Sequence, residues 1–123
     1  MTFDRRRILM SAGAALLLPH AVRAQSRPAI RILVGFPAGG ATDAIARAVA
    51  DRLPNLLGQP VIIDNKAGAG GRLAADAVLA APADGLTYMI APNATPTFQM
   101  LVFAHQVRWD ILKDFTPVAG LGS

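Results

Sequence analysis

The sequence predicts an α/β fold in which a parallel sheet is connected by crossover helices. Three short segments rich in β-branched and apolar residues, 29–36, 60–64 and 86–91, are typical of buried strands. Two segments in which apolar residues follow helical spacing, 42–53 and 72–81, separate them. This order of strands and helices places the helices as right-handed connections between parallel strands.

The first strand and helix are bounded by clear stop and start signals. The strand ends before Pro37, and Thr42 is a favourable N-cap for the helix that follows. Asp43 then lies in the first turn, where a negative charge suits the helix dipole. We expect this helix to run from about Thr42 to Leu53, with Pro54 ending or kinking it because proline lacks the N–H that a helix interior needs.

The second strand and helix repeat this arrangement. The strand Pro60–Asp64 leads through a glycine-rich turn into the helix 72–81, which stops before Pro82. The third strand, 86–91, follows a short turn. The spacing predicts that the helix buries an apolar face made by Leu73, Ala74, Ala77 and Val78.

Glycine-rich turns follow the first two strands, over residues 35–43 and 65–71. Each turn leads into a helix whose first amide N–H groups lack partners and whose dipole is positive at that end. Because ligands bind at the carboxyl ends of parallel strands, both turns and the loop 92–97 should face one crevice. The sequence therefore predicts an anion site at this edge of the sheet.

The first 24 residues have the features of a secretory signal peptide. The charged segment Arg5–Arg7 precedes an apolar segment, 8–18, that is too short to span a bilayer. Small residues at Val22 and Ala24 fit cleavage after Ala24, so residues 25–123 would form the mature, periplasmic chain. The arginine pair also fits a twin-arginine signal, so Sec and Tat export both stay open. A buried N-terminal helix is the alternative, but three arginines do not suit a core.

Composition excludes several classes of function. The formal net charge of +4 comes from 12 basic and 8 acidic residues. The predicted leader holds four of these basic residues and one of the acidic ones, so the mature chain is close to neutral. Its basic residues are scattered and its aromatic residues are few, which argues against a nucleic-acid partner. The chain has no cysteine for a disulfide or a thiolate metal site, and no cofactor is indicated.

The two glycine-rich turns, together with the segments 82–85 and 113–118, resemble those of a known family, the Bug/TctC-type substrate-binding proteins of tripartite tricarboxylate transporters. The resemblance runs from about Ile30 to Val118. It implies a periplasmic solute receptor with two α/β lobes, of which this chain would be a partial lobe of the type II periplasmic-binding-protein fold. It also implies a small carboxylate ligand (a dicarboxylate, tricarboxylate, amino acid or aromatic acid) and delivery to the membrane permease subunits of the transporter. The segments that carry the resemblance are 36–43, 57–71, 82–85 and 113–118.

The resemblance also implies which residues bind the ligand. Two helix N-termini and a hydroxyl can bind a carboxylate through N–H and O–H donors without a buried arginine. Asp43 would orient bridging waters or act as a capping group, because a carboxylate repels an anion. The chain departs from the family at Pro54 and in the loop with Pro92 and Pro96. The implied ligand-binding residues are Phe36, Ala38, Gly39, Gly40, Thr42, Asp43, Ala69, Gly70, Gly71, Asn93 and Thr95.

Receptors of this family are longer than 123 residues, so the chain is expected to be the N-terminal part of a two-lobed protein, without its second lobe. Half of a two-lobed site supplies half of the donors and does not exclude water. We therefore expect the chain alone to bind a carboxylate weakly or not at all. The apolar residues Phe98, Met100, Leu101, Val102 and Phe103 are expected to pack in the core or between the lobes.

Two alternatives remain from the sequence. One is a nucleotide-binding, Rossmann-like enzyme fragment, in which Gly68–Gly71 would bind phosphate and Asp64 a ribose, although neither turn has the Gly-x-Gly-x-x-Gly spacing. The other is a non-functional truncated gene product. Hydrolytic chemistry is not indicated, because the mature chain has one histidine, His105, and serines only at Ser26 and Ser123. The sequence therefore predicts a binding protein and no enzyme.

Overall fold

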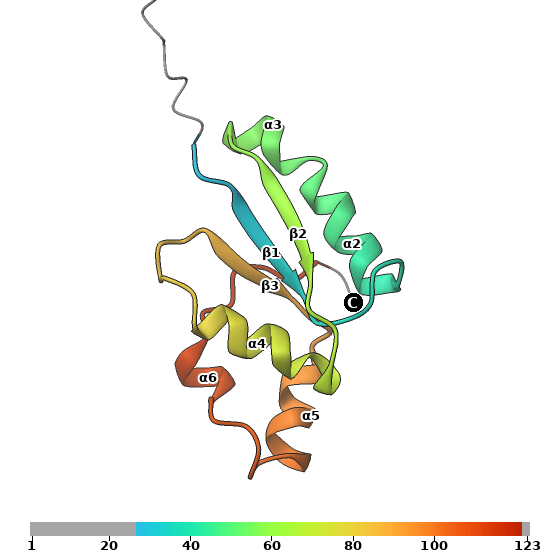
Figure 1. Ribbon diagram of the computed structural model, residues 1–123, viewed down its shortest axis with the longest axis vertical. Coiled ribbons are helices and arrows are strands. Elements are labelled where there is room, and N and C mark those ends of the chain that lie inside the picture. Colours follow the sequence, from blue (N-terminus) through green and yellow to red (C-terminus); the bar gives the residue numbers. More distant parts are fainter. Residues whose placement is uncertain (1–26, 122–123) are drawn as a thin grey trace, which may run out of the picture.

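The computed structural model describes residues 27–121, in which three parallel strands are flanked by helices. The strands are β1 (Ile30–Val34), β2 (Val61–Asn65) and β3 (Thr87–Ile90), and their order in the sheet is β2-β1-β3 (Figure 1). The fold class predicted from the sequence is therefore confirmed. The signal peptide predicted for residues 1–24 lies outside the described residues.

The central strand β1 forms the core of the sheet. It pairs with β2 from Ile30 opposite Val61 to Val34 opposite Asn65, and with β3 on its other side. Its side chains are buried except that of Arg31, which is exposed. A strand covered by helices on both faces loses the polar alternation of a half-exposed strand, which is why β1 is almost continuously apolar.

The segment after β1 forms two helices, α2 (Ala41–Ala50) and α3 (Leu53–Leu57), where the sequence predicted one. Gly40, in an extended conformation, is the N-cap of α2, so the prediction that Thr42 caps this helix is wrong. Pro54 lies in the first turn of α3, where a missing N–H costs nothing, so it starts a helix instead of ending one. Gly58 ends α3 with the left-handed conformation that glycine adopts readily.

A second helical layer lies against β1 and β3. A 3₁₀ turn, η2 (Ala69–Gly71), leads directly into α4 (Arg72–Leu79). Ala74 and Ala75 are the buried residues of α4, whereas Leu73 is 49% exposed, so the predicted apolar face is wrong at Leu73. Alanines on the buried face allow the helix to approach the sheet closely. In Figure 1, α2 and α3 lie on one side of the sheet and α4 on the other.

The last part of the chain forms α5 (Ala94–Val102) and α6 (Ile111–Asp114). Trp109 anchors this part, because its ring is 7% exposed and its Nε1 donates a hydrogen bond of 3.0 Å to Asp76 of α4. Phe115 packs edge-on against the same ring, with 5.5 Å between the ring centroids. Asp110 caps α6 by accepting a hydrogen bond from the Leu112 amide.

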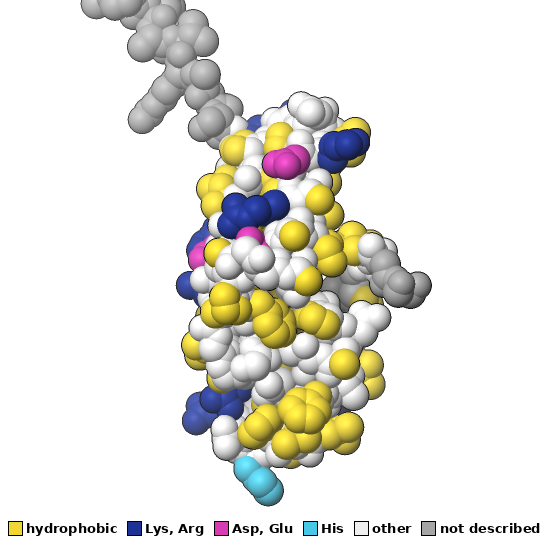
Figure 2. All heavy atoms as spheres, turned by 90° about the vertical axis from the view of Figure 1, so that its right-hand side faces the viewer, with side chains coloured by type: hydrophobic (Ala, Val, Ile, Leu, Met, Phe, Trp, Pro, Cys, Tyr) yellow, Lys and Arg dark blue, Asp and Glu magenta, His cyan; other side chains and the backbone are white. Residues whose placement is uncertain are grey.

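The outer side of α5 exposes apolar side chains. Figure 2 shows them gathered at the end of the molecule that carries α5, beside the histidine. Phe98 and Phe103 form an edge-on pair with 6.2 Å between their ring centroids. Of the two placements expected for this segment, core packing therefore does not apply to the exposed residues Phe98, Leu101, Val102 and Phe103. Among residues 27–121, no helix has the length and apolar character needed to cross a bilayer.

Candidate functional site

The two glycine-rich turns meet at the carboxyl ends of the strands. All three strands point toward the end of the molecule where α5 lies (Figure 1). A Cβ atom placed on Gly35, just after β1, would lie 2.6 Å from the Cα atom of Gly71 in the second turn. The backbones of the two turns are therefore in contact, as the predicted site requires.

The first turn is held by the carboxylate of Asp43, which is only 2% exposed. Its Oδ2 accepts hydrogen bonds of 2.8 Å from the amide of Gly39 and of 2.8 Å from Nε of Arg47. Its Oδ1 accepts one of 2.9 Å from Nδ2 of Asn65. These bonds, with that from Arg47 as the largest cause, hold the pKa of Asp43 well below its usual range. Both oxygens thus accept hydrogen bonds within the protein.

Asn65, the last residue of β2, joins the two turns. Its Nδ2 donates to the carbonyl oxygen of Phe36 at 3.2 Å as well as to Asp43. One side chain from the second turn therefore fixes both the backbone after β1 and the start of α2. Sequence reasoning assigned no role to Asn65. The signal that could have identified it is its position as a polar residue at the end of an apolar strand.

Within the second turn, residues 65–71, the four consecutive residues from Gly68 to Gly71 have positive φ. Ala69 is the one non-glycine residue with positive φ in the described part of the chain. The turn is closed by a hydrogen bond of 3.0 Å from the Gly71 amide to the Gly68 carbonyl. Three glycines in such a run are explained by their freedom to adopt this conformation.

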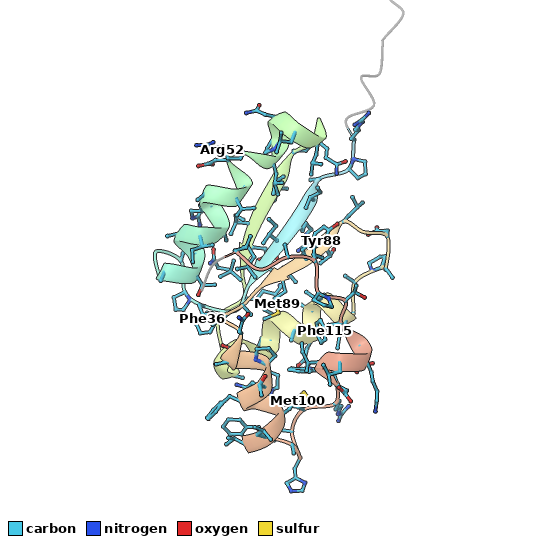
Figure 3. All side chains as sticks on the ribbon, turned by 180° about the vertical axis from the view of Figure 1, so that it is seen from behind. Phe36, Arg52, Tyr88, Met89, Met100 and Phe115 are labelled. Carbon is cyan, nitrogen blue, oxygen red and sulfur yellow. The ribbon has the colours of Figure 1, made fainter. Side chains whose placement is uncertain are left out.

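Gly71 is buried where the three strand ends come together. A Cβ atom on this residue would lie 3.3 Å from Cγ2 of Thr95 and 3.9 Å from side-chain atoms of both Met89 and Phe36. Figure 3 shows Phe36 and Met89 at the end of the sheet that faces α5. The structure thus brings together Phe36, Gly71 and Thr95 from three segments that the sequence assigned to one site.

The remaining predicted site residues lie either in the exposed first turn or at the start of a helix. Ala38, Gly39 and Gly40 are exposed, and the first amides of α2 lie beside them. Asn93 is exposed at the N-cap position of α5 and makes no capping hydrogen bond there. Because α5 begins at Ala94, Thr95 belongs to a helix and not to the expected loop. A ligand could reach the amides of α2 and of the second turn from solvent.

Some backbone amides of the first turn already donate hydrogen bonds to acceptors within the protein. The Gly39 amide is bound to Asp43, and the Gly40 amide lies 3.4 Å from the Pro37 carbonyl. The first-turn amides of a helix, here those of Ala41 and Thr42, have no acceptor within the helix. The anion-binding capacity of the first turn therefore lies at the start of α2 more than at the glycines themselves. Within the described chain, no cluster of three or more acidic or histidine side chains could hold a metal ion.

Gln99 of α5 is a second residue that sequence reasoning missed. It is 5% exposed, and its Nε2 donates hydrogen bonds of 3.1 Å to the carbonyl of Ala69 and of 3.2 Å to that of Gly70. It is the one polar residue in the apolar stretch Phe98–Phe103, and this contrast was the available signal.

Comparison with known proteins gives consistent matches. Residues 45–123 match the model of the tripartite tricarboxylate transporter family receptor. BugT of Bordetella pertussis is 39% identical over 113 residues, which cover 90% of this chain and 34% of BugT. A UPF0065 protein from the tcbD-tcbE intergenic region of Pseudomonas sp. strain P51 is 42% identical over 121 residues, which cover 93% of this chain and 34% of that protein.

A solved structure described as a periplasmic transporter is similar in both sequence and fold. It is 42% identical to this chain and superposes with a TM-score of 0.70 over 74% of this chain and 30% of its own. This likeness supports the fold as part of a periplasmic-binding-protein lobe. The chain spans about a third of the length of the curated relatives it matches.

Proposed function

Because the chain belongs to the family of tripartite tricarboxylate transporter receptors, we propose that it serves as an extracytoplasmic solute-binding protein for a small carboxylate. The family is one of substrate-binding receptors. The chain spans about a third of its relatives' length, so capture and delivery to permease subunits are proposed for the whole receptor to which this region corresponds.

The contact between the two glycine-rich turns is the observation that carries this proposal. Gly35, just after β1, contacts Gly71 in the turn before α4, and Gly71 lies beside Thr95, which supports a shared site at this edge of the sheet. A carboxylate there would accept hydrogen bonds from backbone amides and from the Thr95 hydroxyl, with support from the dipole of α2. We propose Asp43 as a residue that shapes the first turn, and the other residues named from the resemblance as the ligand-facing set.

The proposal includes export and partners. Receptors of this family are periplasmic, and we propose the same compartment for this protein, reached through the signal peptide expected at residues 1–24. The permease subunits of the transporter would be its membrane partners. We propose no catalytic activity, and no observation favours the nucleotide-binding alternative.

A titration followed by NMR tests the proposed site even if affinity is low. Succinate and benzoate would be added to the ¹⁵N-labelled chain, with uncharged succinamide as the matched control for succinate. We expect the acids to move the amide signals of Ala41, Thr42 and Gly70, and the diamide to leave them in place. Signals that move as much with the diamide as with succinate, or that move only with NAD or ATP, would contradict the proposal.

A further inference from the structure

The second turn requires an external support because its backbone conformation is unfavourable. The φ angles of Gly68, Ala69, Gly70 and Gly71 are 139°, 47°, 62° and 90°. L-residues rarely adopt this region, so Ala69 is strained there. Such a conformation persists where surrounding contacts hold it.

Gln99 supplies those contacts from outside the turn. Its Nε2 bonds to two successive carbonyls, those of Ala69 and Gly70. A Cβ atom at Gly70 would collide with this nitrogen, so the absence of a side chain at Gly70 makes room for the bonds. The glutamine is buried although α5 exposes several apolar side chains, which fits a specific role for its amide.

The two bonds decide where the amides of the turn point. In a planar trans peptide, each N–H points opposite to the carbonyl of the preceding residue. The carbonyls of Ala69 and Gly70 point to Gln99, so the amides of Gly70 and Gly71 point away from it. The Gly71 amide bonds to Gly68 within the turn, which leaves the Gly70 amide as the one directed outward.

Gln99 also sets the distance between the turn and Thr95. The two residues lie four positions apart in α5 and therefore share one face of the helix. This face lies along the second turn, since Thr95 is close to Gly71 and Gln99 is bonded to Ala69 and Gly70.

We infer that Gln99 is a positioning residue that holds the second turn in its amide-presenting conformation and places Thr95 beside it. The inference rests on the proposed function for its ligand, a carboxylate. Gln99 itself donates to protein carbonyls and does not need to touch the ligand.

The test replaces Gln99 by methionine, which keeps the length of the side chain and removes the donor. Gln106→Met is the matched control, because Gln106 is exposed and its amide oxygen accepts from Arg72. Hydrogen exchange of the Gly71 and Arg72 amides, which are bonded within the turn, reports on its opening. We expect exchange there to rise about five- to tenfold in Gln99→Met, with the β1 amides and the control unchanged.

Equal exchange in the wild type and in Gln99→Met would overturn the inference, as would equal acceleration throughout β1. If Gln99→Met does not fold, the wild-type chain decides the question. Its Gln99 side-chain protons should show nuclear Overhauser contacts to Gly70, and their absence would contradict the assignment.

Succinate binding then separates this inference from the proposed function. If the wild type binds, Gln99→Met should weaken binding about fivefold or more, and undiminished binding would overturn the positioning role. If the wild type does not bind, as expected for half of a two-lobed site, the exchange data still decide whether Gln99 holds the turn. Amide signals that move only with NAD or ATP would instead contradict the proposed function and leave the exchange result standing.

Discussion

Nδ2 of Asn65 donates a hydrogen bond of 2.9 Å to Oδ1 of Asp43, which ties the end of β2 to the first turn of α2. The same nitrogen bonds the Phe36 carbonyl, so a single amide connects the two glycine-rich turns through side chain and backbone. The shape of the proposed site therefore depends on a residue that need not contact the ligand.

Replacing Asn65 by alanine tests this connection. The change removes the side-chain donor to the Phe36 carbonyl and to Oδ1 of Asp43, while Oδ2 keeps its bonds from Gly39 and Arg47. We expect the free energy of unfolding to fall by about 1–3 kcal/mol. Asn55→Ala in the exposed part of α3 is the matched control, and its effect should stay within about 0.5 kcal/mol. Urea denaturation of both variants measures the difference, and equal midpoints would contradict the role of Asn65.

Acidification should remove the contribution of Asp43 to stability. Its pKa is lowered in the folded chain from the ordinary value of 3.8, chiefly by the hydrogen bond from Arg47. A lowered folded pKa means that the unfolded chain takes up the proton first, so this stability is present above 3.8 and is lost as the pH falls below it.

The variant Asp43→Asn isolates this effect. We expect it to be less stable than the wild type at pH 7, and the gap to narrow on acidification because only the wild type loses a charge at this position. Denaturant titrations of both chains at a series of pH values provide the measurement. Parallel stability curves for the two chains would show that the carboxylate has no special role.

The contact between Gly35 and Gly71 predicts a steric effect. A Cβ atom at Gly35 would meet backbone, which cannot rotate away as a side chain can. We expect Gly35→Ala to lower the free energy of unfolding by about 1–3 kcal/mol. Gly120→Ala, where a Cβ atom has open space, should leave stability unchanged within about 0.5 kcal/mol. Thermal denaturation compares the two, and a neutral Gly35→Ala would mean that the turns are further apart.

Gly39 and Gly85 allow backbone strain to be separated from ligand binding. Both have positive φ, 84° and 75°, and a Cβ atom at either residue would have open space around it. Alanine at either position should therefore cost a similar amount of stability, about 1–2 kcal/mol. Only Gly39→Ala should also weaken succinate binding, as followed by NMR titration. Equal effects of the two changes on binding would place the ligand elsewhere.

The sheet could be predicted from the sequence because its strands are marked by local composition. The apolar run ending in Val34 and the β-branched segment around Ile62 needed no tertiary information, and their glycine-rich ends located the turns. The contact between the turns followed from the parallel arrangement.

The errors in predicting the helices, at Pro54 and at the start of α5, have causes in the local sequence. Pro54 was interpreted as a stop signal, although proline is equally suited to the first turn of a new helix. The start of α5 contains threonines and Pro96, which are weak helix formers, so this segment looked like a loop. Packing against the second turn, through Thr95 and Gln99, overrides that preference.

The hydrogen-bond network of the site could not be predicted, because it joins residues far apart in the chain. Asp43 was assigned by its place in a helix, whereas its Oδ1 accepts a hydrogen bond from Asn65, 22 positions later. Gln99 lies 30 positions after Ala69. Pairings of this kind are set by how the elements pack, and no spacing within one element encodes them.

The position of β1 has a consequence for the order in which the chain can fold. This strand is the first to be synthesised, yet it lies in the middle of the sheet and forms hydrogen bonds only with strands that come later. Its second neighbour is not complete until Ile90 has left the ribosome. Pairing over such separations is slow, so the sheet is completed only after the segment Thr87–Ile90 becomes available to β1.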